Sequence, residues 1–202
     1  MRRERFVNEN FYHVYNRGVE KRLIFVDNTD RKRFAAYLYF LNDKNFFSEH
    51  FSRLNGQGFA SATSAKAKRE PFVNIVSWCL MPNHFHLLLQ QRFDGGISKF
   101  MQKLGTAYTM YFNKRHERSG VLFQGVFKSR PVAEETYLTH VSRYIHLNPL
   151  ELRYKNWEER GVRDVDGALA FLREYLWSSL PVYLEAPERK KSFDKIISAP
   201  VL

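Results

Sequence analysis

The sequence predicts an α+β fold in which helices pack on an antiparallel sheet, and three observations carry this prediction. Short segments rich in aromatic and β-branched residues alternate with segments in which apolar residues recur every three or four positions. Two of the strand-like segments meet at a tight Met-Pro-Asn turn, which favours antiparallel pairing. Hydrophobic residues make up 44% of the 202 residues, which suffices for a core and excludes a disordered chain.

The first half of the chain predicts a strand, a helix and a hairpin. The helix follows start signals between Asp27 and Asp30, and its apolar residues keep the helical period. Small and basic residues dominate the segment after it, which predicts a mobile surface loop of unassigned role. The expected elements are a strand at 11–19, a helix from Asp30 to at least Asn42 with an irregular continuation to Leu54 left open, the loop at 55–70, and hairpin strands at 72–80 and 84–90.

The second half predicts two helices around one strand. We expect a helix at 97–116, a strand at 126–132, and a helix that starts near Glu134 and ends before Pro149. The resulting order, βαββαβ, is that of a ferredoxin-like antiparallel sheet with helices stacked on one face, followed by one additional C-terminal helix. Residues 1–150 would form this domain, and residues 151–202 an extension packed on it. Such a fold implies no function by itself.

Charge and cysteine content restrict the class of protein. The net charge of +11 and the pI of about 9.8 indicate a polyanionic partner, with nucleic acid as the first candidate. The single cysteine, Cys79, allows no internal disulfide, which indicates a reducing compartment and a cytoplasmic protein. No apolar run approaches the roughly 18 residues of a membrane helix, so we expect no membrane partner.

Two histidines follow the Met-Pro-Asn turn. Side chains alternate between the faces of a strand, so His84 and His86 project from the same face. Two imidazoles on one face form half of a metal site. The alternative is a strand-end residue and a half-buried polar group, but a buried imidazole inside so apolar a strand must find a partner.

The last predicted helix carries a second set of polar side chains. Tyr144 and Asn148 lie four residues apart and share one face, with His140 one turn earlier. The alternative is that Tyr144 is a packing aromatic, Asn148 an ordinary residue before a helix-ending proline, and His140 an exposed surface residue. The sequence identifies no partner for His13, His50, His116 or His146.

Taken in this order, the two motifs resemble those of the HUH single-strand transposases that use one catalytic tyrosine. The motifs are Leu80-Met81-Pro82-Asn83-His84-Phe85-His86-Leu87-Leu88 and Tyr144-Ile145-His146-Leu147-Asn148-Pro149. The REP-associated tyrosine transposase branch is the closer match, because it is similar in three further segments: Asn16-Arg17-Gly18, Phe123-Gln124-Gly125 and Trp177-Ser178-Ser179. Each motif alone would be weak, whereas the pair is specific.

The resemblance implies a role for each matching residue. His84, His86 and Asn148 would bind a divalent cation, and Tyr144 would be the nucleophile that forms a 5′-phosphotyrosine. The implied activity is cleavage and rejoining of single-stranded DNA at hairpin repeats, without a nucleotide cofactor. Magnesium prefers oxygen ligands, and this donor set suits manganese or zinc at least as well, so the expectation of Mg²⁺ or Mn²⁺ rests on the resemblance.

Basic residues suggest a path for the DNA. Residues 99–130 hold seven Lys or Arg and one acid, and interleaved aromatic rings could stack on unpaired bases. Arg17, at the end of the first strand, is a further candidate. The predicted nucleic-acid contacts are Arg17, Lys103, Lys114, Arg115, Arg118, Lys128 and Arg130, although some of these charges could form a merely solvated face.

Three other functions compete with the transposase. The first is a domesticated relative that binds structured single-stranded DNA or RNA without cutting it. The second is another HUH nuclease, a replication initiator or relaxase, which usually carries further domains. The third is a metal-dependent phosphodiesterase in which water attacks, so that Tyr144→Phe would stay active. The sequence leaves monomer and homodimer open.

Overall fold

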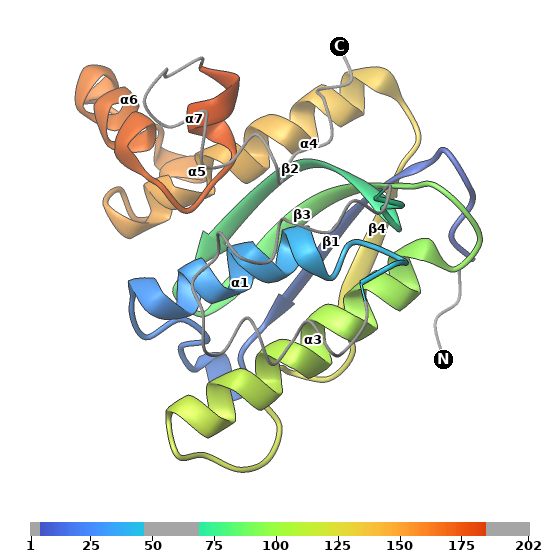
Figure 1. The fold of residues 1–202 in the computed structure, drawn as a ribbon. Helices are drawn as coiled ribbons and strands as arrows, with labels where there is room; N and C mark the ends of the chain where they lie inside the picture. The colour runs from blue at the N-terminus through green and yellow to red at the C-terminus, as the bar shows by residue number, and fades with distance from the viewer. Residues whose placement is uncertain (1–4, 47–68, 185–202) are drawn as a thin grey trace.

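The structure is a computed structural model that describes residues 5–46 and 69–184 (Figure 1). Four strands form one sheet: β1 (Phe11–Arg17), β2 (Val73–Met81), β3 (His84–Gln91) and β4 (Lys128–Val132). Their order is β2-β3-β1-β4, and every neighbouring pair is antiparallel. The predicted α+β fold class is confirmed. The loop expected at 55–70 lies almost wholly outside the described residues. The first helix ends at Phe40, short of the expected Asn42, and the open continuation is not helical over 41–46, while 47–54 lie outside the described residues.

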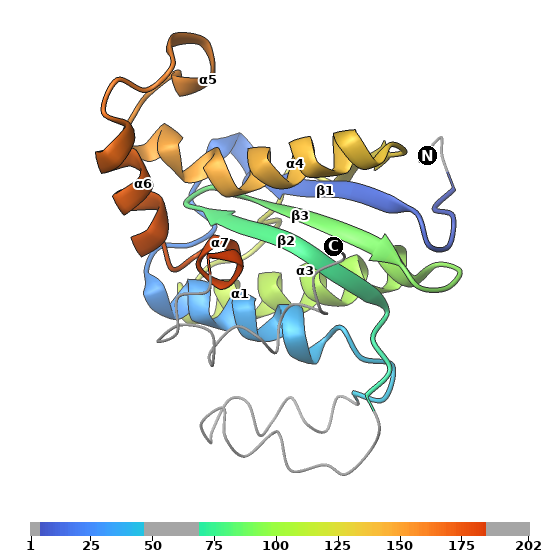
Figure 2. The ribbon, with the colours of Figure 1, turned by 90° about the horizontal axis from the view of Figure 1, so that it is seen from above.

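Helices cover both faces of the sheet. Helices α1 (Asn28–Phe40) and α3 (Gly96–Arg115) lie on one face, and α4 (Glu135–Leu147) lies on the other, as Figure 2 shows from above. The large core between the sheet and α1 and α3 contains fully buried aromatic and aliphatic side chains, among them Val14, Phe34, Leu38, Leu87, Phe100, Leu104 and Tyr108. A smaller apolar cluster lies under α4 and contains Val76, Cys79, Met81, Leu88, Val141 and Ile145.

The alternation of side chains places polar residues under α4. On β3, Phe85, Leu87 and Leu89 fill the large core, so the residues between them point to α4. On β1, Tyr12 and Val14 do the same. A slip of one residue would bring the histidines into the large apolar core, so the buried pattern fixes the register that presents them to α4.

Two strand boundaries differ from the prediction by two residues because the backbone turns there. β1 ends at Arg17 because Gly18 is followed by a 3-10 turn, η1 (Val19–Lys21). A Cβ at Gly18 would lie 2.2 Å from the carbonyl oxygen of Arg22, so only glycine fits this approach. β4 begins two residues later than expected, after Gly125 has taken a φ of 74°.

The residues after α4 pack along the outer edge of β2. They form η3 (Asn148–Leu152), α5 (Trp157–Arg160), α6 (Val165–Glu174) and α7 (Leu180–Tyr183). The Trp177-Ser178-Ser179 segment pairs with β2: the Leu80 amide donates to the Trp177 carbonyl over 2.8 Å, and the Ser179 amide to the Trp78 carbonyl over 2.9 Å. The division of the chain at residue 150 stays a prediction. Among the described residues, no helix is long and apolar enough to span a bilayer.

His146 ties this segment to α4 and predicts an acid-sensitive stability. Its Nε2 lies 2.7 Å from the Ser179 hydroxyl, and burial lowers its pKa from 6.5 to about 4. The unfolded chain binds a proton on His146 near pH 6.5, and the folded chain only near pH 4. The stabilisation from neutral His146 is therefore fully present above pH 6.5 and is lost as the pH falls to 4. We expect about 2–3 kcal/mol of loss from this group between pH 7 and 4.5.

Urea unfolding at a series of pH values measures this loss. His146→Gln, which cannot titrate, should lower stability at pH 7 and show a correspondingly shallower decline towards pH 4.5. A decline as steep as that of the unmodified protein would contradict the assignment.

Candidate active site

The structure brings the four predicted catalytic and metal-binding residues together between the sheet and α4. Nε2 of His84, at the start of β3, lies 3.3 Å from Oδ1 of Asn148. The rings of His84 and His86 lie 5.0 Å apart between centroids, and the ring of Tyr144 lies 5.6 Å from that of His86. The residues of the two motifs therefore meet at one place, which agrees with the prediction that each pair projects from a single face of its strand or helix.

The end of α4 positions two of these side chains. The amide of Asn148 donates to the carbonyl of Tyr144, which completes the last helical hydrogen bond. Pro149 then ends the α-helical pattern, and the chain continues as the 3-10 turn η3. Asn148 is buried and Tyr144 is half-buried, so both side chains are held against the sheet by the helix rather than extended into solvent.

The proton on His84 can be assigned from its neighbours. The Asn83 side-chain amide donates to the Lys21 carbonyl over 3.2 Å, which turns its Oδ1 towards Nδ1 of His84 at 2.7 Å. An amide oxygen only accepts, so Nδ1 of His84 carries the hydrogen. Burial lowers the pKa of His84, which favours the neutral ring, so its Nε2 presents a lone pair.

This assignment leaves two acceptors facing each other. The Nε2 lone pair of His84 meets the Oδ1 of Asn148 at 3.3 Å with no hydrogen between them. A divalent cation bound by both atoms would turn this repulsion into attraction, so the residues present fit a metal ion. Among the described residues, no group of three or more His, Cys, Asp or Glu side chains is arranged for a metal, so the site depends on the asparagine oxygen.

His13 is a site residue that the sequence did not reveal. Its Nε2 lies 2.8 Å from Nδ1 of His86, and its ring lies 5.9 Å from that of Tyr144. No motif singles out this histidine. The one signal that could have found it is the pairing register, in which Tyr15 lies opposite His86 and places the α4-facing residues of β1 beside those of β3.

Two other histidines also have partners that the sequence did not identify. His116 lies 3.0 Å from Asp30, and His146 contacts Ser179. His140 is exposed on α4, where it stacks on Tyr137, so the alternative of a surface residue holds for this histidine. His50 lies outside the described residues.

Burial controls the ionisation of Tyr144. The pKa of its phenol is raised, chiefly by burial, while a hydrogen bond with Asn148 and the charge of Arg130 act in the opposite direction. The phenol is therefore protonated at neutral pH in the protein alone. It would need additional positive charge nearby to become a strong nucleophile.

Three of the seven predicted DNA-contacting residues surround this site. Lys128 and Arg130 are exposed on β4, where the register places them opposite Tyr15 and His13 on β1. Burial is the main reason that the pKa values of His13 and His84 are lowered, and the charges of Arg130 on His13 and of Arg17 on His84 act in the same direction. The mouth of the site is therefore positively charged.

The other four predicted contacts lie away from the imidazoles, on α3 or just after it. Lys103 donates to the Asp43 carbonyl over 3.2 Å, and Lys114 is exposed. Arg115 forms ion pairs with Asp27 and Asp30, at 2.6 Å to Asp27. Arg118 donates to the side chain of Asn113 over 2.7 Å. The structure thus divides the predicted path between the two faces of the sheet, and a DNA role for these four residues stays a prediction.

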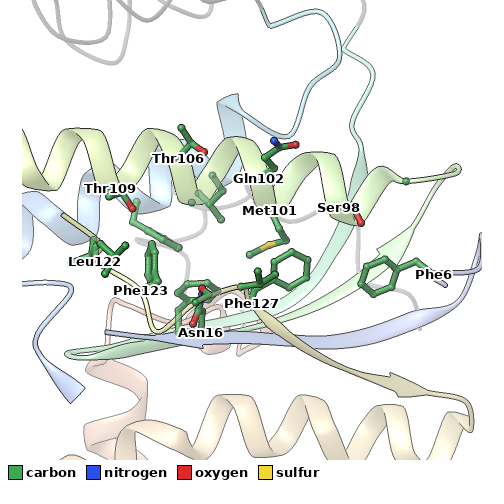
Figure 3. Close-up of a pocket in the computed structure, with 18 of the residues that line it drawn as sticks. Phe6, Asn16, Ser98, Met101, Gln102, Thr106, Thr109, Leu122, Phe123 and Phe127 are labelled. Carbon is green, nitrogen blue, oxygen red and sulfur yellow. The ribbon is translucent and has the colours of Figure 1, made fainter. Parts of the chain in front are cut away.

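A groove also lies on the α3 face. It encloses about 1390 Å³ between α3 and β1, and Figure 3 shows Phe6, Met101, Phe123 and Phe127 pointing into it. Asn16 lines its floor, but none of the four converging residues does. The groove is therefore separate from the candidate active site.

Comparison with known proteins agrees with the motifs. Residues 57–148 match the model of a family described as IS200-like transposases. The predicted resemblance to transposases is confirmed. The matched IS200-like segment contains His84, His86, Tyr144 and Asn148.

Two further comparisons add little to the IS200-like match. Among solved structures, the chain is similar to a REP-associated tyrosine transposase bound to a REP hairpin, with 11% identity and a TM-score of 0.44 over 76% of this chain and 74% of that one. No curated protein matches the chain in sequence.

Proposed function

We propose that this protein is a metal-dependent single-stranded DNA transposase that cleaves and rejoins strands at hairpin repeats through a 5′-phosphotyrosine. The observation that carries the proposal is the convergence of Tyr144 with the donor set of His84, His86 and Asn148 under α4. The match to IS200-like transposases over the same residues supports it.

Tyr144 would act as the nucleophile. Its phenolic oxygen forms a bond to the scissile phosphorus, the bond from phosphorus to the 3′-oxygen breaks, and the phenolic proton passes to solvent while the 3′-oxygen takes one up. The products are a 5′-phosphotyrosine on one fragment and a free 3′-hydroxyl on the other. A second 3′-hydroxyl can reverse the step and join a new strand, because the phosphodiester is exchanged rather than hydrolysed.

His84, His86 and Asn148 would hold the cation, which we expect to be Mg²⁺ or Mn²⁺. A bound divalent ion would polarise the scissile phosphate and offset its charge. The protein contributes ligands held in place before binding, because Asn148 is fixed by the end of α4 and His84 by Asn83.

The charged mouth would bind the strand on either side of the scissile phosphate. The imidazoles are surrounded by Arg17, Lys128 and Arg130. Contact between these cationic side chains and the DNA phosphates would release counterions from the DNA. A hairpin would extend beyond this mouth, and the cationic residues of α3 remain candidates for its more distant phosphates.

The test is a denaturing gel with hairpin oligonucleotides drawn from repeats that flank the gene. One oligonucleotide set is labelled at the 5′ end and a second at the 3′ end, with Mg²⁺, Mn²⁺ or EDTA. We expect a covalent protein–DNA band that needs metal and retains only the 3′-end label, since the tyrosine joins the 5′-phosphate of the downstream fragment.

Each alternative gives a different result in this gel. Cleavage without a covalent band would indicate attack by water. A covalent band that retains the 5′-end label would contradict the assigned polarity. Binding to the cognate hairpin with no cleavage in either metal would favour the non-catalytic binder.

The positive charge of Lys128 and Arg130 at the mouth of the site predicts how the affinity for single-stranded DNA depends on salt concentration. Replacing both Lys128 and Arg130 by Gln should lower the slope of log affinity against log salt for a short single strand by about 1.4, because about 0.7 counterions are released per phosphate contact. A matched control, Lys114→Gln with Arg118→Gln, removes the same charge from α3 and should leave the slope for the short strand unchanged. Equal effects of the two pairs would contradict this placement of the strand.

A further inference from the structure

His13 and His86 share one hydrogen between two ring nitrogens. Nε2 of His13 and Nδ1 of His86 lie 2.8 Å apart, and the rings are nearly parallel, with an interplanar angle of 27°. His86 is buried and His13 half-buried. A neutral imidazole has one donor and one acceptor nitrogen, so exactly one of the two rings donates in this contact.

The direction of this hydrogen bond decides what the far nitrogen of His86 can do. If His13 donates, Nδ1 of His86 is the acceptor and its Nε2 carries a hydrogen. If His86 donates, its Nε2 presents a lone pair. Only the second arrangement gives His86 a metal-binding nitrogen, because Nδ1 is already occupied by His13.

We infer that His13 is a positioning residue: it accepts the Nδ1 hydrogen of His86 and thereby holds the His86 tautomer whose Nε2 binds the cation. The function of this tautomer rests on the proposed transposase activity. The tautomer itself rests on the contact between the two rings and can be measured without metal or DNA.

The neighbouring histidine shows the same design. His84 donates its Nδ1 hydrogen to Oδ1 of Asn83, which leaves its Nε2 free. Each histidine of the motif would then have one outer acceptor that fixes its ring, Asn83 for His84 and His13 for His86. Outer partners of this kind orient metal-binding imidazoles and contribute to metal affinity.

The choice of an imidazole as the acceptor suits the site. A carboxylate in the place of His13 would also accept the hydrogen, but it would add a negative charge where a DNA phosphate must approach. A neutral histidine accepts without that charge, and the cationic Arg130 lies opposite His13 in the β1–β4 register.

The first experiment reads the tautomer in the metal-free protein. Long-range ¹H–¹⁵N correlation spectra of the histidine rings should show a protonated Nδ1 and an unprotonated Nε2 for His86. In His13→Phe, which keeps a ring and removes the acceptor, the His86 signals should shift towards the Nε2-protonated form. A protonated Nε2 on His86 in the unmodified protein would overturn the inference.

The second experiment measures Mn²⁺ binding by electron paramagnetic resonance, without DNA. We expect His13→Phe to bind Mn²⁺ about 10–100-fold more weakly, and His13→Gln, whose amide oxygen can accept, to recover most of that affinity. His140→Phe, on the exposed face of α4, is the matched control and should bind normally. Unchanged Mn²⁺ affinity in folded His13→Phe would overturn the role in metal binding.

The two proposals can fail separately. If His86 shows the expected tautomer and the protein binds no Mn²⁺ or Mg²⁺, the contact between His13 and His86 stands and the metal-dependent function fails. If metal binds tightly while His86 carries its hydrogen on Nε2, the inference about His13 fails and the function stands on another ligand set.

Discussion

Replacing Tyr144 by Phe is expected to abolish the covalent protein–DNA band and to lower strand cleavage by about 10³-fold or more, the scale of loss when a nucleophile is removed. The change deletes one oxygen atom and keeps the ring that packs beside His13 and His86. The fold and the metal ligands should therefore survive, and Mn²⁺ affinity should stay within a few-fold of normal. The denaturing gel described above measures the band, and the rate of fragment release measures cleavage.

A second tyrosine makes this prediction sharper. The ring of Tyr15 lies 5.8 Å from that of His86, so its phenol is a rival nucleophile at the site. Tyr15→Phe should keep the covalent band, and Tyr137→Phe, on the exposed part of α4, should behave as the unmodified protein. A band that survives Tyr144→Phe and disappears in Tyr15→Phe would reassign the nucleophile, and cleavage that persists in both would indicate attack by water.

The sequence predicted the architecture well because the strands and helices differ strongly in period. His84 and His86 alternate with Phe85 and Leu87, so both the strand and the face that carries the histidines can be read directly. Boundaries were less accurate where the backbone turns at glycine, as after Arg17 and before Lys128. The position of α4 on the opposite face was not predicted, because nothing in the local pattern says which face a later helix will cover.

The candidate site was predictable only where its residues lie close together in the sequence. His84 and His86, or Tyr144 and Asn148, share a face through a local period, and the family resemblance joined the two pairs. His13 lies on a different strand, and its contact with His86 depends on the β1–β3 register, to which no motif points. Long-range pairing of this kind needs the three-dimensional structure.

The basic residues of α3 also have long-range contacts that the sequence does not reveal. Counting charges along residues 99–130 predicts a continuous cationic path, but it does not reveal which charges are already neutralised by partners far away in the chain. Arg115 is separated from Asp27 and Asp30 by more than eighty positions, and yet it pairs with both. Arg115 therefore stabilises the fold through these two ion pairs, a role that the sequence alone did not indicate.

This ion-pair cluster joins the start of α1 to the end of α3. The Asp30 side chain has no exposed surface, and it accepts hydrogen bonds from the Val26 amide and the Tyr111 hydroxyl as well as from Arg115. His116 lies 3.0 Å from the same carboxylate. One buried carboxylate on α1 therefore satisfies donors from α3 and from the segment before α1, and its loss would leave the guanidinium and the phenol without their shared acceptor.

Asp30→Ala is consequently expected to lower the free energy of unfolding by about 3–5 kcal/mol, the usual effect of removing one partner from a buried ion pair. Asp27→Ala is the matched control, because Asp27 pairs with the same Arg115 but has a partly exposed side chain and also caps α1. Its loss should cost only about 1 kcal/mol, the typical value of an N-cap. Urea unfolding at pH 7 compares the two variants. Equal losses would mean that burial of the Asp30 carboxylate adds nothing to the ion pair, and that the link between α1 and α3 is a surface interaction.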